Sequence, residues 1–209
     1  MTARLNTTDF AILGLLARRP WSAYEMTQYM RASNIRAIWP RAESRIYESP
    51  KKLASLGFAA VTTEAQGKRS RAVYRITAEG QAALDDWLAE EGKPFLFEYE
   101  ELLKLNLGDI RDPGHLATHL ERLGSQGQAD WDQLTHWFRL FAQQEASDIS
   151  ADRMAQNLLI NCFIKELLEA RLRWSDYAQE FEQKFAACDT DDAKEEWVAH
   201  CYRELLGEE

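Results

Sequence analysis

The chain has 209 residues, of which 45% are hydrophobic and 28% are charged, and its formal net charge is −9. This composition supports a folded core and excludes an intrinsically disordered chain. The longest apolar runs, 10–17 and 158–164, are much shorter than the roughly 20 residues of a membrane span, and no secretory signal is evident. Three cysteines without metal-ligand spacing fit a reducing compartment, so we expect a cytoplasmic protein without a zinc finger.

Charge is divided unevenly along the chain. Through Leu88 there are 13 Lys/Arg and 8 Asp/Glu, whereas from Ala89 onward there are 12 and 26. A basic zone on an acidic chain is typical of a surface that binds polyanions, because phosphate neutralisation dominates affinity for nucleic acids. Charge alone fits solubility equally well, and the acidic half would repel DNA and so orient the basic half towards it.

Local signals predict two short helices at the start of the chain. Cap candidates over 6–9 and the apolar run 10–17 predict a first, buried helix. Ser22 is the expected cap of a second helix over 23–32. Residues 33–40 are expected to form a loop.

A third helix is predicted over 42–56, with Gly57 as its stop. Pro50 conflicts with one smooth helix, because proline removes a backbone donor and clashes with the preceding turn. Two interpretations remain open. One is a local kink, which we favour, and the other is a break at which Ser49 caps a new segment.

A basic hairpin and a fourth helix follow. Strands are predicted over 58–64 and 71–76, joined by a polar, glycine-containing turn over 65–70. Thr77 is the expected cap of the fourth helix, whose buried stripe is predicted to be Leu84, Trp87 and Leu88. The charged junction 90–94 is the expected domain boundary.

The second half of the chain is predicted to be helical. Apolar residues recur at steps of three and four within 99–106, 116–141, 163–185 and 193–205. Gly127 interrupts the second of these segments and is expected to loosen that helix.

Three helices, a two-stranded hairpin and a fourth helix occur in the order of a winged helix-turn-helix domain, whose later helix enters the major groove of DNA. We therefore predict a mainly α fold, with a winged-helix DNA-binding domain over 1–90 and an α-helical domain over 95–209. A single basic or hydroxyl side chain is more often a solvated surface group than a DNA contact. Here such donors are concentrated on the third helix and on the hairpin, which are expected to be neighbours, and this favours DNA contact. The candidate DNA-binding residues are Arg41, Ser44, Arg45, Tyr47, Lys51, Lys52, Lys68, Arg69 and Arg71.

An ordered set of motifs covers nearly all of residues 5–90. The set comprises Ala11–Leu16, Ser22–Met26, Trp39–Pro40, Ser44–Tyr47, Lys51–Leu53, Leu56–Phe58 and Tyr74–Gly80. Together these motifs resemble the PadR-type transcriptional regulators. Glu48 departs from the family pattern by replacing the proline of its Tyr-Pro pair, and Pro50 stands where the family usually has leucine. Base contacts are therefore not carried over from the family.

The resemblance implies a homodimeric transcriptional repressor that binds double-stranded DNA at a two-fold symmetric operator and is relieved by a small aromatic effector. The helical half is similar to the larger family subgroup, in which a long C-terminal helical domain serves dimerisation. Aromatic and apolar residues of the helical half recur in a stripe at helical spacing. Such a stripe suits a bundle core or a dimer interface, and we favour this interpretation. It also suits an effector pocket between helices. The residues assigned to this effector or dimer interface are Trp131, Phe163, Leu167, Trp174, Tyr177 and Phe181.

Enzyme chemistry has no support in the sequence. No nucleophile elbow, phosphate loop or dinucleotide fingerprint occurs, so we expect no enzyme, no catalytic residue and no cofactor. His115 and His119 stand four apart, but no nearby cysteine completes a metal site, and none is expected. The alternative to a regulator is a helical protein-interaction adaptor that retains the winged-helix fold without binding DNA. Salt-dependent binding to its own upstream DNA would distinguish the two.

Overall fold

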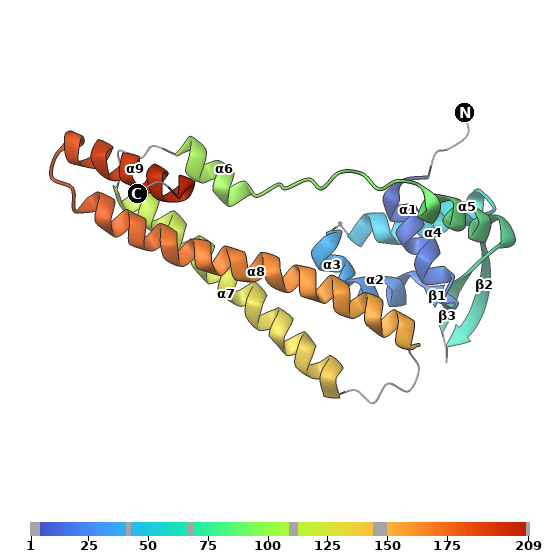
Figure 1. Cartoon of the computed structure of the whole chain (residues 1–209). Coiled ribbons are helices and arrows are strands. Elements are labelled where there is room, and N and C mark those ends of the chain that lie inside the picture. The colour runs from blue at the N-terminus through green and yellow to red at the C-terminus, as the bar shows by residue number, and fades with distance from the viewer. Residues whose placement is uncertain (1–4, 41–42, 67–68, 109–112, 144–149, 208–209) are drawn as a thin grey trace. The chain divides into compact units, whose positions relative to one another are not determined.

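The computed structural model describes residues 5–40, 43–66, 69–108, 113–143 and 150–207, and the chain divides into two compact units, Met1–Phe95 and Leu96–Glu209. The fold is mainly helical with one small antiparallel sheet, in agreement with the predicted fold class (Figure 1). The described ranges contain no helix long and apolar enough to span a membrane. The elements of the first unit are α1 (Thr7–Leu16), β1 (Trp21–Ser22), α2 (Ala23–Arg31), α3 (Ile35–Ile38), α4 (Glu43–Ser55), β2 (Ala59–Gln66), β3 (Arg69–Ile76) and α5 (Ala78–Ala89).

Side-chain caps fix the beginnings of α1 and α2. The Asn6 side chain accepts hydrogen bonds from the backbone N–H groups of Thr8 and Asp9, and the Asp9 carboxylate accepts one from the N–H of Asn6. Ser22 and Glu25 form the same reciprocal box at the start of α2. Such caps satisfy donors that a helix start leaves without partners, so the first two predicted helices are confirmed.

The third predicted helix is α4, and it runs without interruption through Pro50. The alternative of a break at Ser49 is therefore wrong. Gly57 has a φ of 82°, and beyond it the N–H of Phe58 donates to the carbonyl of Leu53 at 3.0 Å. This 6→1 bond is the mark of a left-handed helix end that favours glycine, so the predicted stop at Gly57 is confirmed.

The sheet has three antiparallel strands in the order β1-β3-β2. The predicted hairpin is confirmed, but its strands extend into the predicted turn, and Gln66 still pairs with Arg69. The two-residue strand β1 was not predicted, because two residues carry no periodicity; Trp21 lies opposite Tyr74 there. The predicted loop 33–40 likewise contains the single-turn helix α3.

The first unit has its own apolar core. α1 is buried on most of its surface, as predicted, and packs with residues from α2, α4, β3 and α5. Phe10 stacks on Trp87, with ring centroids 4.9 Å apart. Leu84 is buried as predicted, whereas Leu88 is 65% exposed, so its assignment to the buried stripe is wrong. The buried members of this core are Ile12, Leu13, Leu15, Leu16, Trp21, Met26, Met30, Ile46, Leu53, Ala59, Tyr74 and Leu84.

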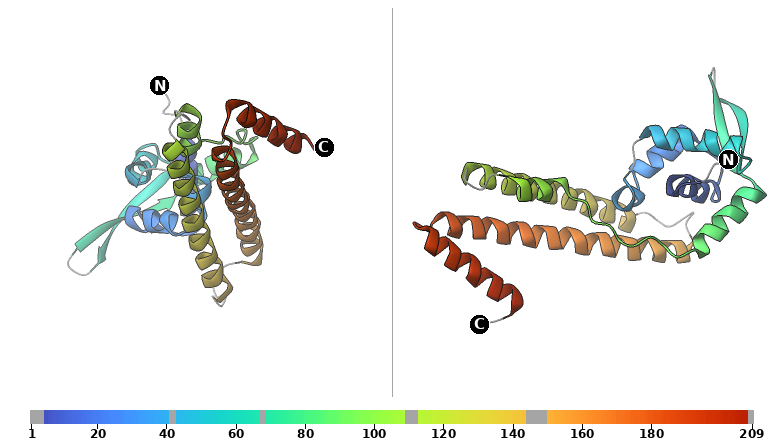
Figure 2. Two further views of the ribbon diagram at one scale, coloured as in Figure 1. Left: turned by 90° about the vertical axis from the view of Figure 1, so that its left-hand side faces the viewer. Right: turned by 90° about the horizontal axis from the view of Figure 1, so that it is seen from above.

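The second unit consists of α6 (Glu100–Leu107), α7 (Pro113–Gln143), α8 (Ala151–Ala186) and α9 (Asp191–Leu206). α7 and α8 are long helices that pack side by side, as two views agree (Figure 2). α7 continues through Gly124 and Gly127, so the expectation of a loosened helix is wrong. A Cβ on Gly124 would lie 2.8 Å from the Ser175 hydroxyl, and one on Gly127 would lie 3.3 Å from Leu172. These glycines therefore permit the close approach of α8.

α9 folds back along the C-terminal end of α8. Thr190 caps it through the N–H of Ala193, and its Trp197 ring lies 6.3 Å from that of Phe181. Lys184 lies over the Trp197 ring at 5.1 Å, and Lys194 over Phe185 at 5.5 Å. These contacts cover the last turns of α8 from within the same chain.

Candidate nucleic-acid interface

α4 has one buried and one exposed face. Ile46, Ser49, Pro50 and Leu53 are buried and hold the helix on the first unit. The opposite face is open to solvent, and its exposed polar side chains include Ser44, Arg45, Tyr47, Glu48 and Lys51. Donors for base edges and phosphates stand together on this face, which is what a helix that enters the major groove requires.

A buried carboxylate anchors the second half of α4. Asp9 of α1 is only 1% exposed, and its carboxylate accepts hydrogen bonds from the Ser49 hydroxyl at 2.7 Å and from the Lys52 ammonium. Pro50 stands between these two donors and cannot donate to the carbonyl of Ile46. The Asp9 network therefore ties α4 to α1 beside the proline. It also directs Lys52, a predicted DNA contact, towards the interior of the domain.

A second ion-pair network lies on the hairpin, where Arg71 is opposite Glu64, two residue pairs from the last pair before the turn. The Arg71 guanidinium bridges Glu25 of α2 at 3.3 Å and Glu64 of β2 at 3.5 Å. The Ser22 backbone N–H and hydroxyl, together with Arg71 and Arg19, lower the pKa of Glu25. Arg71 therefore links α2 to the hairpin, although it was predicted as a phosphate contact at the tip.

The structure describes the remaining predicted DNA contacts to different extents. Arg41 and Lys68 lie outside the described residues, and for Arg69 the structure describes only the backbone, which begins β3 opposite Gln66. Ser44, Arg45, Tyr47 and Lys51 are the predicted residues that the structure brings together on one exposed surface. Glu48 lies on the same face but was not predicted as a site residue, because a carboxylate does not suggest contact with a polyanion.

In the helical unit, the six residues predicted for an effector or dimer interface fall into an exposed group and a group with partners inside the unit. Phe163, Leu167 and Tyr177 are 53%, 41% and 43% exposed. The side chains that α8 buries are instead Ile164, Leu168, Ser175 and Ala178. The first three residues therefore lie beside the bundle core and not within it.

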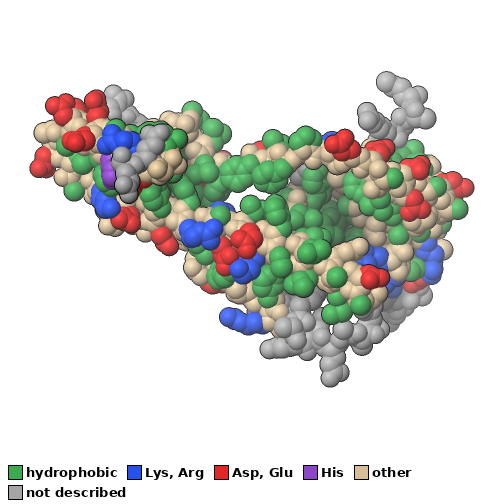
Figure 3. Space-filling view, in the orientation of Figure 1, with side chains coloured by type: hydrophobic (Ala, Val, Ile, Leu, Met, Phe, Trp, Pro, Cys, Tyr) green, Lys and Arg blue, Asp and Glu red, His purple; other side chains and the backbone are tan. Residues whose placement is uncertain are grey.

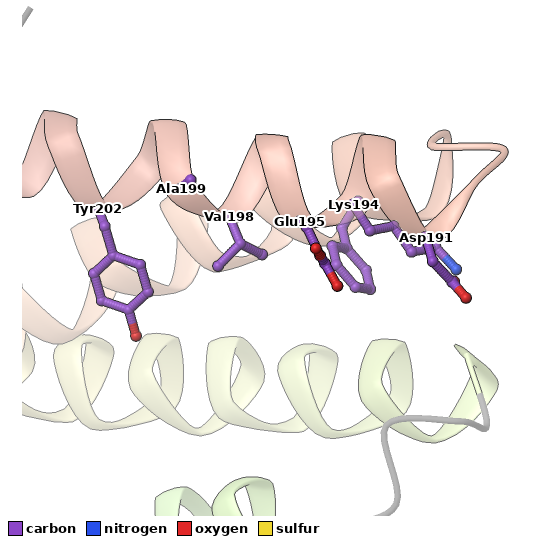
Figure 4. A pocket seen from close by; sticks show the side chains of 7 residues that line it. Asp191, Lys194, Glu195, Val198, Ala199 and Tyr202 are labelled. Atoms are coloured by element: carbon purple, nitrogen blue, oxygen red, sulfur yellow. The ribbon is translucent and has the colours of Figure 1, made fainter.

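Trp131, Trp174 and Phe181 have partners inside the unit. Trp174 packs against the cluster of Leu120, Leu123 and Ala178, Phe181 contacts Trp197, and Lys165 lies over the Trp131 ring at 6.0 Å. A shallow depression lies between α9 and the end of α8 (Figure 4). None of the six residues predicted for an effector or dimer interface lines it. Its lining consists of Phe185, Asp191, Lys194, Glu195, Val198, Ala199 and Tyr202.

An uncharged surface extends along the N-terminal half of α8. Residues 154–164 contain no Asp, Glu, Lys or Arg, and hydrophobic side chains gather on the visible face of the molecule (Figure 3). We call its exposed apolar members Met154, Leu158, Leu159 and Phe163, together with Leu167 one turn further on, the α8 apolar face.

Metal-binding groups do not cluster in the part of the chain that the structure describes: no three His, Cys, Asp or Glu residues there come together to hold an ion. His119 is buried and its Nδ1 lies 3.3 Å from the Glu101 carboxylate. Lys104 and then His119 lower the pKa of Glu101. The contact between Glu101 and His119 holds α6 on α7.

Comparisons with known proteins agree with the fold and with the motifs. Residues 12–86 match the Transcriptional regulator PadR-like family. The Negative transcriptional regulator PadR of Bacillus subtilis is 38% identical over 85 residues, which are 40% of this chain and 46% of that protein. The chain thus matches about half the length of this relative. Both descriptions name transcriptional regulators and not enzymes.

Solved structures extend the likeness to the helical half. The chain is similar to Bacillus subtilis PadR in complex with operator DNA, with a TM-score of 0.71 and 23% identity over 84% of this chain and 99% of that one. It is also similar to the same protein in complex with p-coumaric acid, with a TM-score of 0.63 and 22% identity over 86% and 99%. Residues 12–86 are therefore similar to the Transcriptional regulator PadR-like family, and the solved structures show that the likeness in fold extends over most of the chain.

Proposed function

We propose that this protein is a DNA-binding transcriptional regulator that reads base edges in the major groove with α4. The observation that carries the proposal is the exposed face of α4, on which Ser44, Arg45, Tyr47 and Lys51 stand together. The hairpin would contact phosphates through its tip, as wings do. The complex of Bacillus subtilis PadR with operator DNA supports the same use of this fold.

We further propose that the regulator is a homodimer joined through the α8 apolar face. An uncharged, exposed helical surface of several turns is costly in water and is typical of a large, apolar interface. A dimer would present two copies of α4 to half-sites one helical turn apart, roughly 34–36 Å. The similarity to the Negative transcriptional regulator PadR supports the proposal that this protein represses transcription.

The proposed effector is a small aromatic molecule, the class that includes the p-coumaric acid bound by Bacillus subtilis PadR. A ligand with unequal affinity for two arrangements of the dimer would change the separation of the two α4 helices. It would thereby lower the affinity for DNA by the difference in binding free energy.

Replacing Arg45 with alanine is expected to lower preference for the operator more than it lowers affinity for random DNA. The expected cost is roughly 1–3 kcal/mol, because a guanidinium on this face can bind a guanine edge at two points. The measurement is a titration of the full chain with a duplex selected from genomic fragments and with a random duplex. Arg203→Ala removes an equal charge from an exposed position on α9 and serves as the control.

Two outcomes would contradict this assignment. Equal losses on both duplexes would make Arg45 a phosphate contact and not a base contact. If the wild-type protein shows no salt-dependent binding to any selected duplex, the adaptor without DNA binding becomes the better interpretation.

Replacing Arg69 with alanine is expected to weaken binding to selected and random duplexes alike, because a phosphate contact carries no sequence information. The slope of log affinity against log salt should fall by about 0.9 for each phosphate that the variant no longer neutralises. Titrations at several salt concentrations measure this slope. An unchanged slope would mean that the Arg69 side chain does not contact the DNA backbone.

A further inference from the structure

We propose that Glu48 determines specificity on α4, and that its carboxylate accepts a hydrogen bond from the exocyclic amino group of a cytosine. The inference rests on the proposed function of α4 as the helix that reads the major groove. It assigns a base to an exposed acidic residue on the face of α4 that otherwise carries donors.

Glu48 stands in the middle of the exposed face of α4. Ser44 lies one turn before it and Lys51 about one turn after it, while Tyr47 is its neighbour in the chain. Ser49 and Pro50 follow immediately on the buried face. A base edge read by Ser44 or Lys51 would therefore lie within one helical turn of the Glu48 carboxylate.

Among the residues that the structure describes, no cation forms an ion pair with the Glu48 carboxylate, although Arg45 and Lys51 stand three residues before and after it. Lys52 stands four residues later, in the order that favours a surface ion pair along a helix. The Lys52 ammonium lies instead on the buried Asp9 carboxylate. The Asp9 network thus leaves Glu48 available as an acceptor.

An acidic group on a surface that faces DNA is repelled by the phosphates and lowers affinity for duplexes in general. The penalty is offset only where a base edge presents a donor without a neighbouring acceptor. In the major groove, guanine presents two acceptors and thymine presents one, whereas adenine presents its amino donor next to the acceptor N7. Cytosine presents its amino group alone, so it is the base that a carboxylate favours.

The test is selection of duplexes from a randomised library by the full-length protein. We expect the wild type to select cytosine at one position of each half-site. Glu48→Gln is expected to change that position to adenine, because a carboxamide pairs with the adenine donor and N7 together. Glu48→Ala is expected to lose preference at that position and at no other. Asp86→Asn, which removes an exposed charge from α5, is expected to retain the wild-type selection.

Affinities give a second readout that a loss of folding cannot imitate. Glu48→Ala is expected to raise affinity for a random duplex while it lowers the ratio of selected to random affinity about tenfold. Losses on both duplexes would give Glu48 a structural role and overturn the inference. Retention of the wild-type selection by both Glu48 variants would also overturn it but leave the proposed function intact. A wild type that selects no sequence from the library would overturn both.

Discussion

Replacing Leu158 and Phe163 with glutamate is expected to convert the proposed full-length dimer into a folded monomer and to lower operator affinity about a hundredfold or more. Both side chains are exposed on α8, whereas the chain packs its own bundle with Ile164 and Leu168. The new carboxylates can therefore remain in water in the monomer, but a dimer interface would bury them without partners. The loss in affinity follows because two linked half-site contacts bind about 10²–10⁴ times more tightly than one.

Sedimentation of the full chain at micromolar concentration measures the expected change in mass, and far-UV circular dichroism checks that the variant remains helical. Leu88→Glu combined with Leu107→Glu is the matched control, because both leucines are exposed and lie on α5 and α6. Trp174 and Phe181 are poorer targets, since each packs inside the helical unit. A wild-type monomer, or a dimer that survives both glutamates, would contradict the proposed interface.

Most helix boundaries were predictable because local chemistry determines them. Ser22 and Thr77 each accept a hydrogen bond from a backbone N–H three residues later, and Gly57 adopts the left-handed conformation that ends a helix. Each signal lies within a few residues of its effect. The winged-helix order could be inferred from these boundaries together with the alternation along the hairpin.

The faces of the long helices were less predictable, because apolar residues of α8 fall on more than one side. Phe163 and Ile164 are neighbours, yet only Ile164 is buried against the bundle. The difference depends on where α7 approaches, and this approach depends on Gly124 and Gly127. Periodicity identifies an apolar side chain but cannot tell which partner covers it.

The candidate DNA surface shows a similar limit. Lys51 and Lys52 are equivalent in the sequence, but Lys51 is exposed and Lys52 lies on Asp9, which is distant in the chain. Arg71 looked like a hairpin-tip donor until the register put it opposite Glu64 and within reach of Glu25. Which cations remain available for DNA is thus decided by tertiary ion pairs that no local pattern encodes.

Lys52→Met is expected to destabilise the first unit by about 3 kcal/mol, because it leaves the buried Asp9 carboxylate without its cation. Asp9→Asn should cost less, about 2 kcal/mol, since an amide can still pair with Ser49 and Asn6 while Lys52 reaches water. The double variant is expected to cost less than the sum of the two, because each single change removes the same ion pair.

Hydrogen exchange of the backbone amides in α1 and α4 of the full chain measures these free energies on the unit concerned. The same variants decide whether Lys52 contributes to DNA binding. If its charge is committed to Asp9, folded Lys52→Met retains the wild-type slope of log affinity against log salt, whereas Lys51→Met lowers it. Additive costs in the double variant would show that the ion pair contributes nothing to stability. A reduced slope in Lys52→Met would return Lys52 to the set of phosphate contacts, because only a charge that reaches the DNA backbone releases counterions on binding.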